Sequence, residues 1–262
     1  MIKKEVTILI LILGMVFAGL ANSNNNQLAY AHNFTPNSLS TFITLVYRAQ
    51  VELSLANGSF PLNVTMALDH AEDAAKLIDD AYYSDEEIVD DADFARKYNE
   101  ALNARNSTIH ALVIANIVDQ ILREYGKAFD IGYDLTNMSN MMRGDMPDVT
   151  SYPAPPSGSA NNIDIPTNST NQNNELRVVN IADYQSAQKL LEKAYQIFRG
   201  SLSLLPLPSN NTDPSIMAKL EKSMKDLSYL VEIKAPAQEL MTLVHGEIHP
   251  SLQLAYDLGL KQ

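Results

Sequence analysis

The chain has 262 residues, no cysteine and a formal net charge of −12 at pH 7. Without cysteine there are no disulfides and no thiolate metal sites, so stability has to come from a packed core. The negative charge would repel nucleic acid and anionic lipid, and we expect neither as a partner.

The first 31 residues are predicted to be a signal peptide. Two lysines precede an apolar run over 6–21 that is too short to span a bilayer comfortably. Ala-Tyr-Ala at 29–31 is the favoured cleavage site, with Gly-Leu-Ala at 19–21 and a retained anchor as the alternatives. Cleavage at the favoured site makes His32 the first mature residue, whose amine and ring could both bind one metal ion. We therefore expect an extracytoplasmic protein that does not bind the membrane directly after cleavage.

Glycosylation acceptors support export independently. The chain carries more Asn-x-Ser/Thr motifs than its composition predicts by chance, which favours a glycosylated surface protein. An Asn-rich chain also generates such motifs freely. The candidate asparagines are Asn33, Asn57, Asn63, Asn106, Asn137, Asn168 and Asn210.

The elements predicted before residue 144 are all helical. A first helix over 36–56 is expected to start with Thr35 as N-cap and Pro36 in its first turn, and to stop at Asn57-Gly58. A second helix over 64–83 is amphipathic. Its apolar stripe is predicted to be Leu68, Ala71, Ala75, Ile78 and Tyr82.

A capping signature at Ser84 and Glu87 predicts the next helix start, and helical pattern continues to about 135 with a break near Asn106. The acidic run over 85–93 lacks the glycine and the ligand spacing of a calcium loop, so we interpret it as an exposed helix start. No segment has the period-2 alternation of a strand.

The segment 144–176 differs in composition from the rest of the chain. It is rich in Pro, Ser, Asn and Thr and poor in large apolar residues, which predicts a flexible linker. Helix resumes over 181–205, another begins at Asp213-Pro214, and the last runs from Pro236 to about 258.

The sequence therefore predicts an all-α fold of antiparallel helical bundles. We expect an N-terminal bundle over 32–143 and a C-terminal bundle over 177–262, joined by the linker. One interpretation is that the halves are duplicated three-helix units, because AAKLIDDAY (74–82) aligns with AQKLLEKAY (187–195) and YDL recurs at 133–135 and 256–258. Such strings are also common in unrelated amphipathic helices.

The five histidines are the main candidates for chemistry. His245 and His249 are four residues apart, which on a helix places two imidazoles on one face within reach of one ion, although Pro250 is expected to end or kink that helix. His70 and His110 lie on apolar helix faces. Each is a core histidine or, in a converging site with His32, a third metal ligand.

Four methionines form a second candidate group: Met138, Met141, Met142 and Met146. Thioethers suit Cu(I) and remain available in an oxidising exterior. The alternative is that they fill the end of the bundle or form an adaptable apolar contact surface.

Three stretches resemble a family of uncharacterised exported helical proteins from ammonia-oxidising archaea: AYAHNFTPNS, DHAEDAAKLI and VHGEIHPSLQLAYDLGL. The resemblance covers the expected mature N-terminus, the second helix and the last helix, and it carries over no functional residues. It implies an extracytoplasmic location in archaeal cells that depend on copper enzymes, which raises copper above zinc and other metals.

No catalytic motif is present, so we do not expect an enzyme. The leading hypothesis is an exported helical protein that binds metal, most plausibly copper with zinc as the alternative, for storage or delivery at the cell surface. The alternatives are a metal-free envelope or surface-layer interaction module, and an accessory subunit of a membrane enzyme complex.

Overall fold

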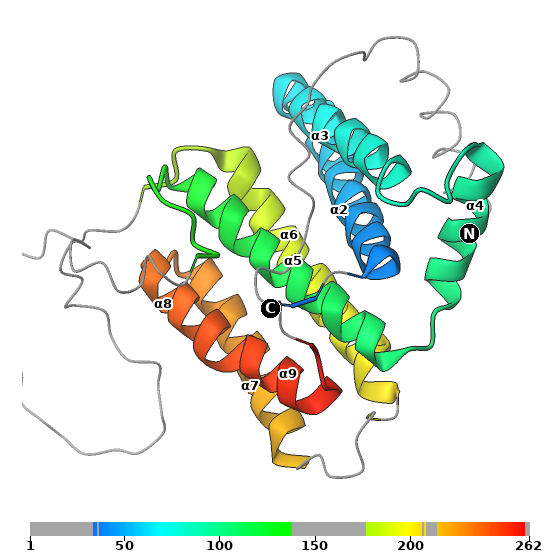
Figure 1. Cartoon of the computed structure of the whole chain (residues 1–262). Helices are drawn as coiled ribbons and strands as arrows, with labels where there is room; N and C mark the ends of the chain where they lie inside the picture. Colours follow the sequence, from blue (N-terminus) through cyan, green and yellow to red (C-terminus); the bar gives the residue numbers. More distant parts are fainter. Residues whose placement is uncertain (1–33, 36, 138–176, 206, 208–213, 260–262) are drawn as a thin grey trace, which may run out of the picture.

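A computed structural model describes residues 34–35, 37–137, 177–205, 207 and 214–259. The predicted all-α fold is confirmed, and no strand occurs in these residues. The predicted signal peptide, the predicted linker, His32 and the four methionines lie outside the described residues. The α-helices are α2 (Ser38–Ser59), α3 (Val64–Tyr82), α4 (Asp91–Asn103), α5 (Ser107–Ala128), α6 (Ile181–Gly200), α7 (Pro214–Glu232), α8 (Ala237–Leu243) and α9 (His249–Tyr256) (Figure 1). A short 3₁₀ turn, η2 (Leu202–Leu204), follows α6, and a π-helical turn, η3 (Val244–Ile248), joins α8 to α9.

Asparagine side chains start four of these helices. Each accepts hydrogen bonds from backbone N–H groups that the first turn leaves without helical partners. The four N-caps are Asn37, Asn63, Asn106 and Asn180. The predicted break near Asn106 is confirmed, with that asparagine as the cap of α5.

Both predicted ends of the first helix were wrong. Its N-cap is Asn37 instead of Thr35, because the Asn37 side chain accepts from Ser40 N at 3.0 Å. At the other end α2 runs through Gly58 to Ser59. It stops only at Phe60, which is extended because it precedes Pro61.

The capping signature at Ser84 was also misread. The Ser84 hydroxyl donates to the Ala81 carbonyl at 2.8 Å and so caps the end of α3, while α4 begins later with Asp90 as N-cap. The acidic run does contain that helix start. One of its acids, Asp85, is instead buried in an ion pair with Lys97 at 2.7 Å, which fixes the loop to α4.

The apolar stripe predicted for α3 is not the face that the helix buries. Its buried residues are Ala67, His70, Ala74, Leu77 and Ala81, whereas Leu68 is 64% exposed. The helix therefore packs through the small-residue stripe that contains His70. Small side chains let α3 approach α2 closely along its length.

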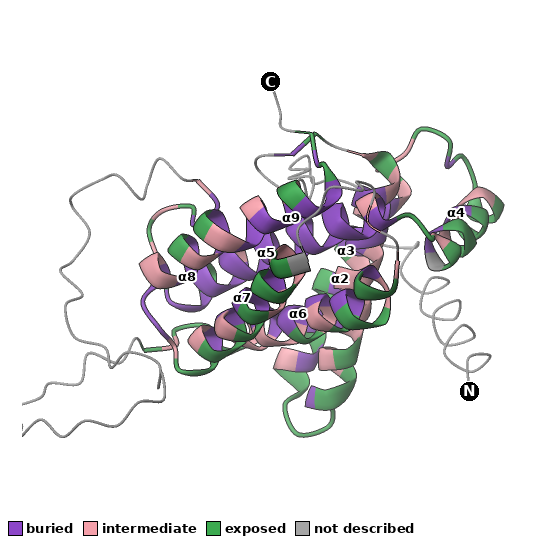
Figure 2. Ribbon diagram, turned by 90° about the horizontal axis from the view of Figure 1, so that it is seen from below, coloured by how far each residue is buried: buried purple, intermediate pink, exposed green. Residues whose placement is uncertain are grey.

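Helix α5 lies at the centre of the molecule. The α2–α3 hairpin covers one side of it, α7, α8 and α9 cover another, and α6 runs alongside (Figure 1). Nearly every residue of α5 is buried, whereas α4 is largely exposed (Figure 2). The predicted helix to 135 ends at Ala128, followed by Asp130 in the left-handed region at φ 52°.

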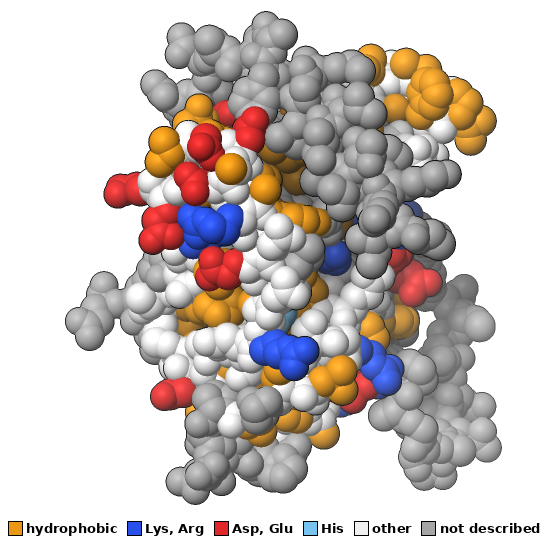
Figure 3. Space-filling model, turned by 90° about the vertical axis from the view of Figure 1, so that its right-hand side faces the viewer, with side chains coloured by type: hydrophobic (Ala, Val, Ile, Leu, Met, Phe, Trp, Pro, Cys, Tyr) orange, Lys and Arg blue, Asp and Glu red, His pale blue; other side chains and the backbone are white. Residues whose placement is uncertain are grey.

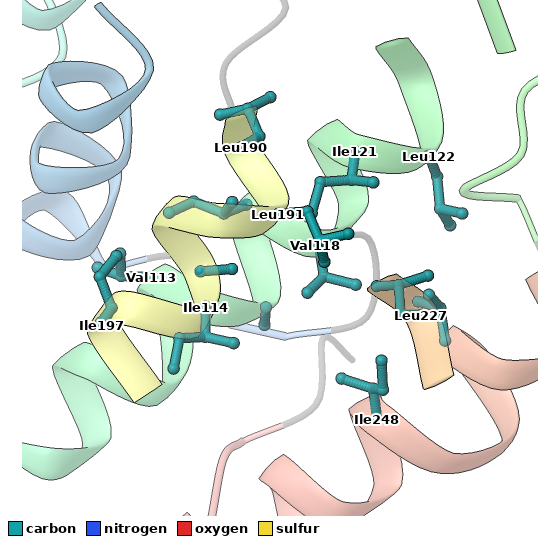
Figure 4. Close-up of a cluster of buried hydrophobic side chains, with 14 of the residues drawn as sticks. Val113, Ile114, Val118, Ile121, Leu122, Leu190, Leu191, Ile197, Leu227 and Ile248 are labelled. Carbon is teal, nitrogen blue, oxygen red and sulfur yellow. The ribbon is translucent and has the colours of Figure 1, made fainter. Parts of the chain in front are cut away.

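One hydrophobic core joins residues from both sides of the predicted linker. In Figure 4, Val118 and Ile121 of α5 lie beside Leu191 of α6, and Leu227 and Ile248 approach from the C-terminal helices. The two predicted bundles therefore share a core. The aligned repeat positions are buried alike, Ala74, Leu77 and Ala81 in α3 and Ala187, Leu190 and Ala194 in α6. Duplication of the halves stays a prediction.

None of the helices in the described ranges combines the length and the apolar character needed to cross a bilayer.

The shared core predicts the outcome of cleaving the chain between 144 and 176, where the sequence predicts the first proteolytic cut. The two fragments should stay associated, because separating them would expose the α5–α6 contact. Limited proteolysis followed by native size-exclusion chromatography and mass spectrometry should find both in one peak. Folded fragments that elute separately would contradict a shared core.

Candidate functional site

The last helical segment continues past Pro250, so the expected helix end there is wrong. The backbone widens into the π turn η3, where the His249 N–H donates to the Val244 carbonyl five residues earlier. A proline ring clashes with the carbonyl four residues before it in a regular α-helix, and the wider turn relieves that clash. His249 therefore keeps helical dihedrals and leads into α9.

This turn brings His245 and His249 together, as their spacing predicted. Their ring centroids are 5.3 Å apart at an interplanar angle of 71°, and both side chains are buried. The edge of one imidazole faces the plane of the other.

His249 is held by a carboxylate from the central helix. Its Nε2 lies 3.2 Å from Oδ1 of Asp119 in α5, and that carboxylate is completely inaccessible to solvent. The ring of Phe34 packs edge-on against His249 with centroids 5.5 Å apart. Next to Phe34, Thr35 N donates to the Gly259 carbonyl at 2.8 Å, so the described N- and C-terminal ends meet beside the pair.

His245 is held by a backbone carbonyl. Its Nε2 lies 3.2 Å from the oxygen of Leu135, which follows α5. A carbonyl oxygen can only accept, so Nε2 carries the proton and the lone pair of the neutral ring is on Nδ1. The approach of His249 Nε2 to Asp119 Oδ1 lies within ion-pair distance but is not a hydrogen bond, so it fixes no tautomer of His249. His245 thus directs its N–H group at a fixed acceptor, an arrangement that orients metal-binding histidines.

The other two described histidines have separate roles. The Nδ1 atom of His70 lies 2.7 Å from Oε2 of Glu52, and both residues are buried between α3 and α2. Burial lowers the pKa of His70, but the hydrogen bond and charge of Glu52 outweigh it and the net shift is upward. The Nε2 atom of His110 donates to the Ala104 carbonyl at 2.8 Å and closes the turn before α5.

Neither His70 nor His110 therefore stands beside the His245–His249 pair. Within the described ranges, no three His, Asp or Glu side chains converge as metal ligands. These two histidines have the core role that their apolar helix faces favoured.

Asp119 and Glu52, the acids beside two of the histidines, were not among the predicted site residues. Asp119 interrupts the apolar run IANIVDQIL of α5. An acid in the middle of an apolar helix face signals a buried charge that needs a partner, and that signal was available.

A second polar group, also missed, lies where α5 meets α6. Glu124 accepts from Lys127 Nζ at 3.1 Å and forms a short contact with Gln120. Burial, with the charge of Glu124 as a further cause, raises the pKa of Asp183 to about 6.

Comparison with known proteins gave no relative. No family model matches the chain, and no match was found among the curated sequences or the solved structures compared with it.

The raised pKa of Asp183 predicts a pH-dependent stability. Because the folded state binds this proton more tightly than the unfolded state, Asp183 disfavours folding above about pH 6 and ceases to do so below about pH 4. Asp183→Asn should stabilise the protein at pH 7.5 by about 1 kcal/mol, after allowance for solvent screening, and should leave it unchanged near pH 4. Urea unfolding at both pH values measures this.

The exposed Asp226, paired with Lys222 on the surface of α7, supplies the control. Asp226→Asn should leave the pH dependence as in the wild type. If Asp183→Asn and the wild type have the same pH slope, then Asp183 does not titrate as described.

Proposed function

We propose that this protein is exported and binds a transition-metal ion, most plausibly copper, through His245 and His249, for storage or delivery at the cell surface without catalysis. The observation that carries the proposal is the pair of adjacent buried imidazoles whose Nε2 atoms face Leu135 O and Asp119 Oδ1. With its proton on Nε2, His245 would ligate a metal through Nδ1, and His249 would offer one of its two ring nitrogens.

The chemistry of these ligands narrows the choice of metal. Neutral imidazole suits copper and zinc, whereas calcium and magnesium prefer oxygen ligands. The resemblance to exported proteins of ammonia-oxidising archaea favours copper, with zinc as the alternative. Burial of the pair supports retention of an ion, because access of water to the ligands is restricted.

A third ligand is expected to complete the site. His32 is the candidate because it precedes Phe34 by two positions in the sequence, and the Phe34 ring contacts His249 at 5.5 Å. Signal-peptide cleavage after Ala31 would add its free amine. The four methionines offer softer ligands for the reduced ion.

Export and glycosylation rest on the sequence motifs, and the exposure of Asn57, Asn63 and Asn106 is compatible with them. Asn63 and Asn106 use Oδ1 as helix caps, which leaves Nδ2, the atom that carries a glycan, outside the cap. The cap role also offers a second reason for their presence.

One observation favours the metal-free interaction module as a second candidate. The tip of the α2–α3 hairpin exposes Phe60 by 63%, Leu62 by 93% and Leu68 by 64%. Figure 3 shows hydrophobic side chains gathered on the projection at its upper right, at the height of this tip in Figure 1. An exposed apolar surface of this kind suits contact with an envelope protein or with a subunit of a membrane complex.

Calorimetric titration of the protein beginning at His32 tests the metal site. Cu(II) or Zn(II) should bind at pH 7.5, and His245→Ala or His249→Ala should weaken binding at least about tenfold, because each removes an imidazole ligand. Binding should also weaken as the pH falls through about 6.5, where protons compete for the same lone pairs.

His70→Gln is the matched control, since it changes a buried histidine outside the pair and keeps a donor for Glu52. Its affinity should equal that of the wild type. Equal and weak binding by wild type and His245→Ala would assign the metal to the acidic surface and refute the site.

Asp119 provides a separate prediction. Asp119→Asn keeps the shape of the side chain but removes the negative charge that holds His249, so metal affinity should fall by about 10- to 100-fold. Competition with a chromophoric chelator measures this, and thermal unfolding shows whether the variant is folded. A folded variant with unchanged affinity would give Asp119 a purely structural role.

A further inference from the structure

A further group of polar side chains lies between α2, α4 and α6. Its charged member is a lysine, which distinguishes it from the histidine pair. Lys193 of α6 is half-buried, with Nζ 4.1 Å from the centroid of the Tyr47 ring. The same Nζ donates to Oε1 of Gln50 at 3.2 Å. None of the ion pairs in the described ranges includes Lys193. Of the five lysines that do form ion pairs there, four have their carboxylate three or four residues away.

The hydrogen bonds around Gln50 have a definite direction. Its Oε1 accepts from Lys193, and its Nε2 donates to the hydroxyl oxygen of Tyr98 in α4 at 3.3 Å. The Tyr98 oxygen is therefore an acceptor, and its own proton is available to donate. No acceptor for that proton occurs among the described residues. The Gln50 amide thus hydrogen-bonds to two groups that can each donate to a ligand, the Lys193 ammonium and the Tyr98 hydroxyl.

The environment of Lys193 also favours an anionic ligand beside its ammonium group. Burial lowers the pKa of Lys193, and burial together with Tyr98 raises the pKa of Tyr47. Both shifts show an environment of reduced water access, where an uncompensated ammonium is unfavourable and an anion beside it is favoured.

The group is open to ligands at its edge. Tyr47, Gln50, Tyr98 and Lys193 all keep partial solvent exposure. Helix α4 contacts the rest of the described chain mainly through α2, and Figure 3 looks onto this side of the molecule.

We propose that Lys193 and Tyr98 form a binding site for the oxyanion of a small ligand, a carboxylate or a phosphate. Lys193 supplies the charge, the Tyr98 hydroxyl supplies a directed hydrogen bond, and Gln50 sets the spacing of the two donors. The ring of Tyr47 supports the ammonium and offers an apolar surface to the body of an organic acid. This site is independent of the proposed metal site and uses none of its residues.

Lysine acetylation by a water-soluble active ester, read by peptide mass spectrometry at pH 8, tests the proposal on the folded chain. Benzoate and inorganic phosphate are the probes, and chloride at equal ionic strength is the reference. One of the two probes should slow acetylation of Lys193 saturably, by about fivefold or more, while the exposed Lys219 and the partly exposed Lys234 react at unchanged rates. Protection by benzoate alone identifies an organic acid, and protection by phosphate alone identifies a phosphate ligand.

Tyr98→Phe keeps the ring and removes the donor, so it should raise the probe concentration for half-protection by about fivefold. Tyr195→Phe, on the same helix as Lys193 but stacked against Arg199, should change nothing. The proposal is overturned if neither probe protects Lys193 or if the acetylation of all lysines is slowed equally. It is also overturned if the probe protects Lys193 in Tyr98→Phe as well as in the wild type.

Discussion

The arrangement of this molecule depends on the burial of one carboxylate. Helix α5 is enclosed on nearly all sides, and Asp119 in its middle has no access to water. A buried charge without a partner costs several kcal/mol, so the helix that covers Asp119 must present a donor there. His249 comes within ion-pair distance, with Nε2 3.2 Å from Oδ1, and the π turn before it sets the rotation that brings the ring into place. The position of His245 follows from that same turn, because it lies one turn earlier on the same face.

Besides its long contact with α6, helix α5 has two flanking contacts of different chemistry. Towards α7, α8 and α9 the contact is largely apolar, and the buried Tyr125 hydroxyl closes it by donating to the Ala235 carbonyl at 2.6 Å. Towards the α2–α3 hairpin it contains polar groups, among them the Asn116–Thr44 hydrogen bond and the nearby Glu52–His70 pair. Apolar burial does not depend on pH, whereas carboxylate and imidazole groups titrate. Titratable groups lie on both sides of α5, since Asp119 and His249 meet on the side of α9.

Asparagine occurs in this sequence both as a helix N-cap and in the predicted glycosylation motifs. Two of the glycosylation motifs, at Asn63 and Asn106, coincide with helix N-caps, and Asn37 and Asn180 cap helices without being in such motifs. An asparagine side chain satisfies backbone donors at a helix start whether or not it carries a glycan. Helix capping thus explains part of the Asn-rich composition. The motifs at Asn63 and Asn106 therefore indicate export less strongly than motifs without a capping role.

The sequence by itself determined the all-α class, the range of α3, the break at Asn106 and the pairing of His245 with His249, because each follows from spacing or capping within one helix. It did not determine the end of the first helix, which Pro61 sets, or the buried face of α3, where two stripes of similar hydrophobicity compete. Only the tertiary structure decided that Asp119 holds His249, that Glu52 holds His70, and that Gln50 joins Lys193 to Tyr98. These contacts connect residues 18 to 143 positions apart. Packing of separate helices creates such contacts, and no local pattern in the chain encodes them.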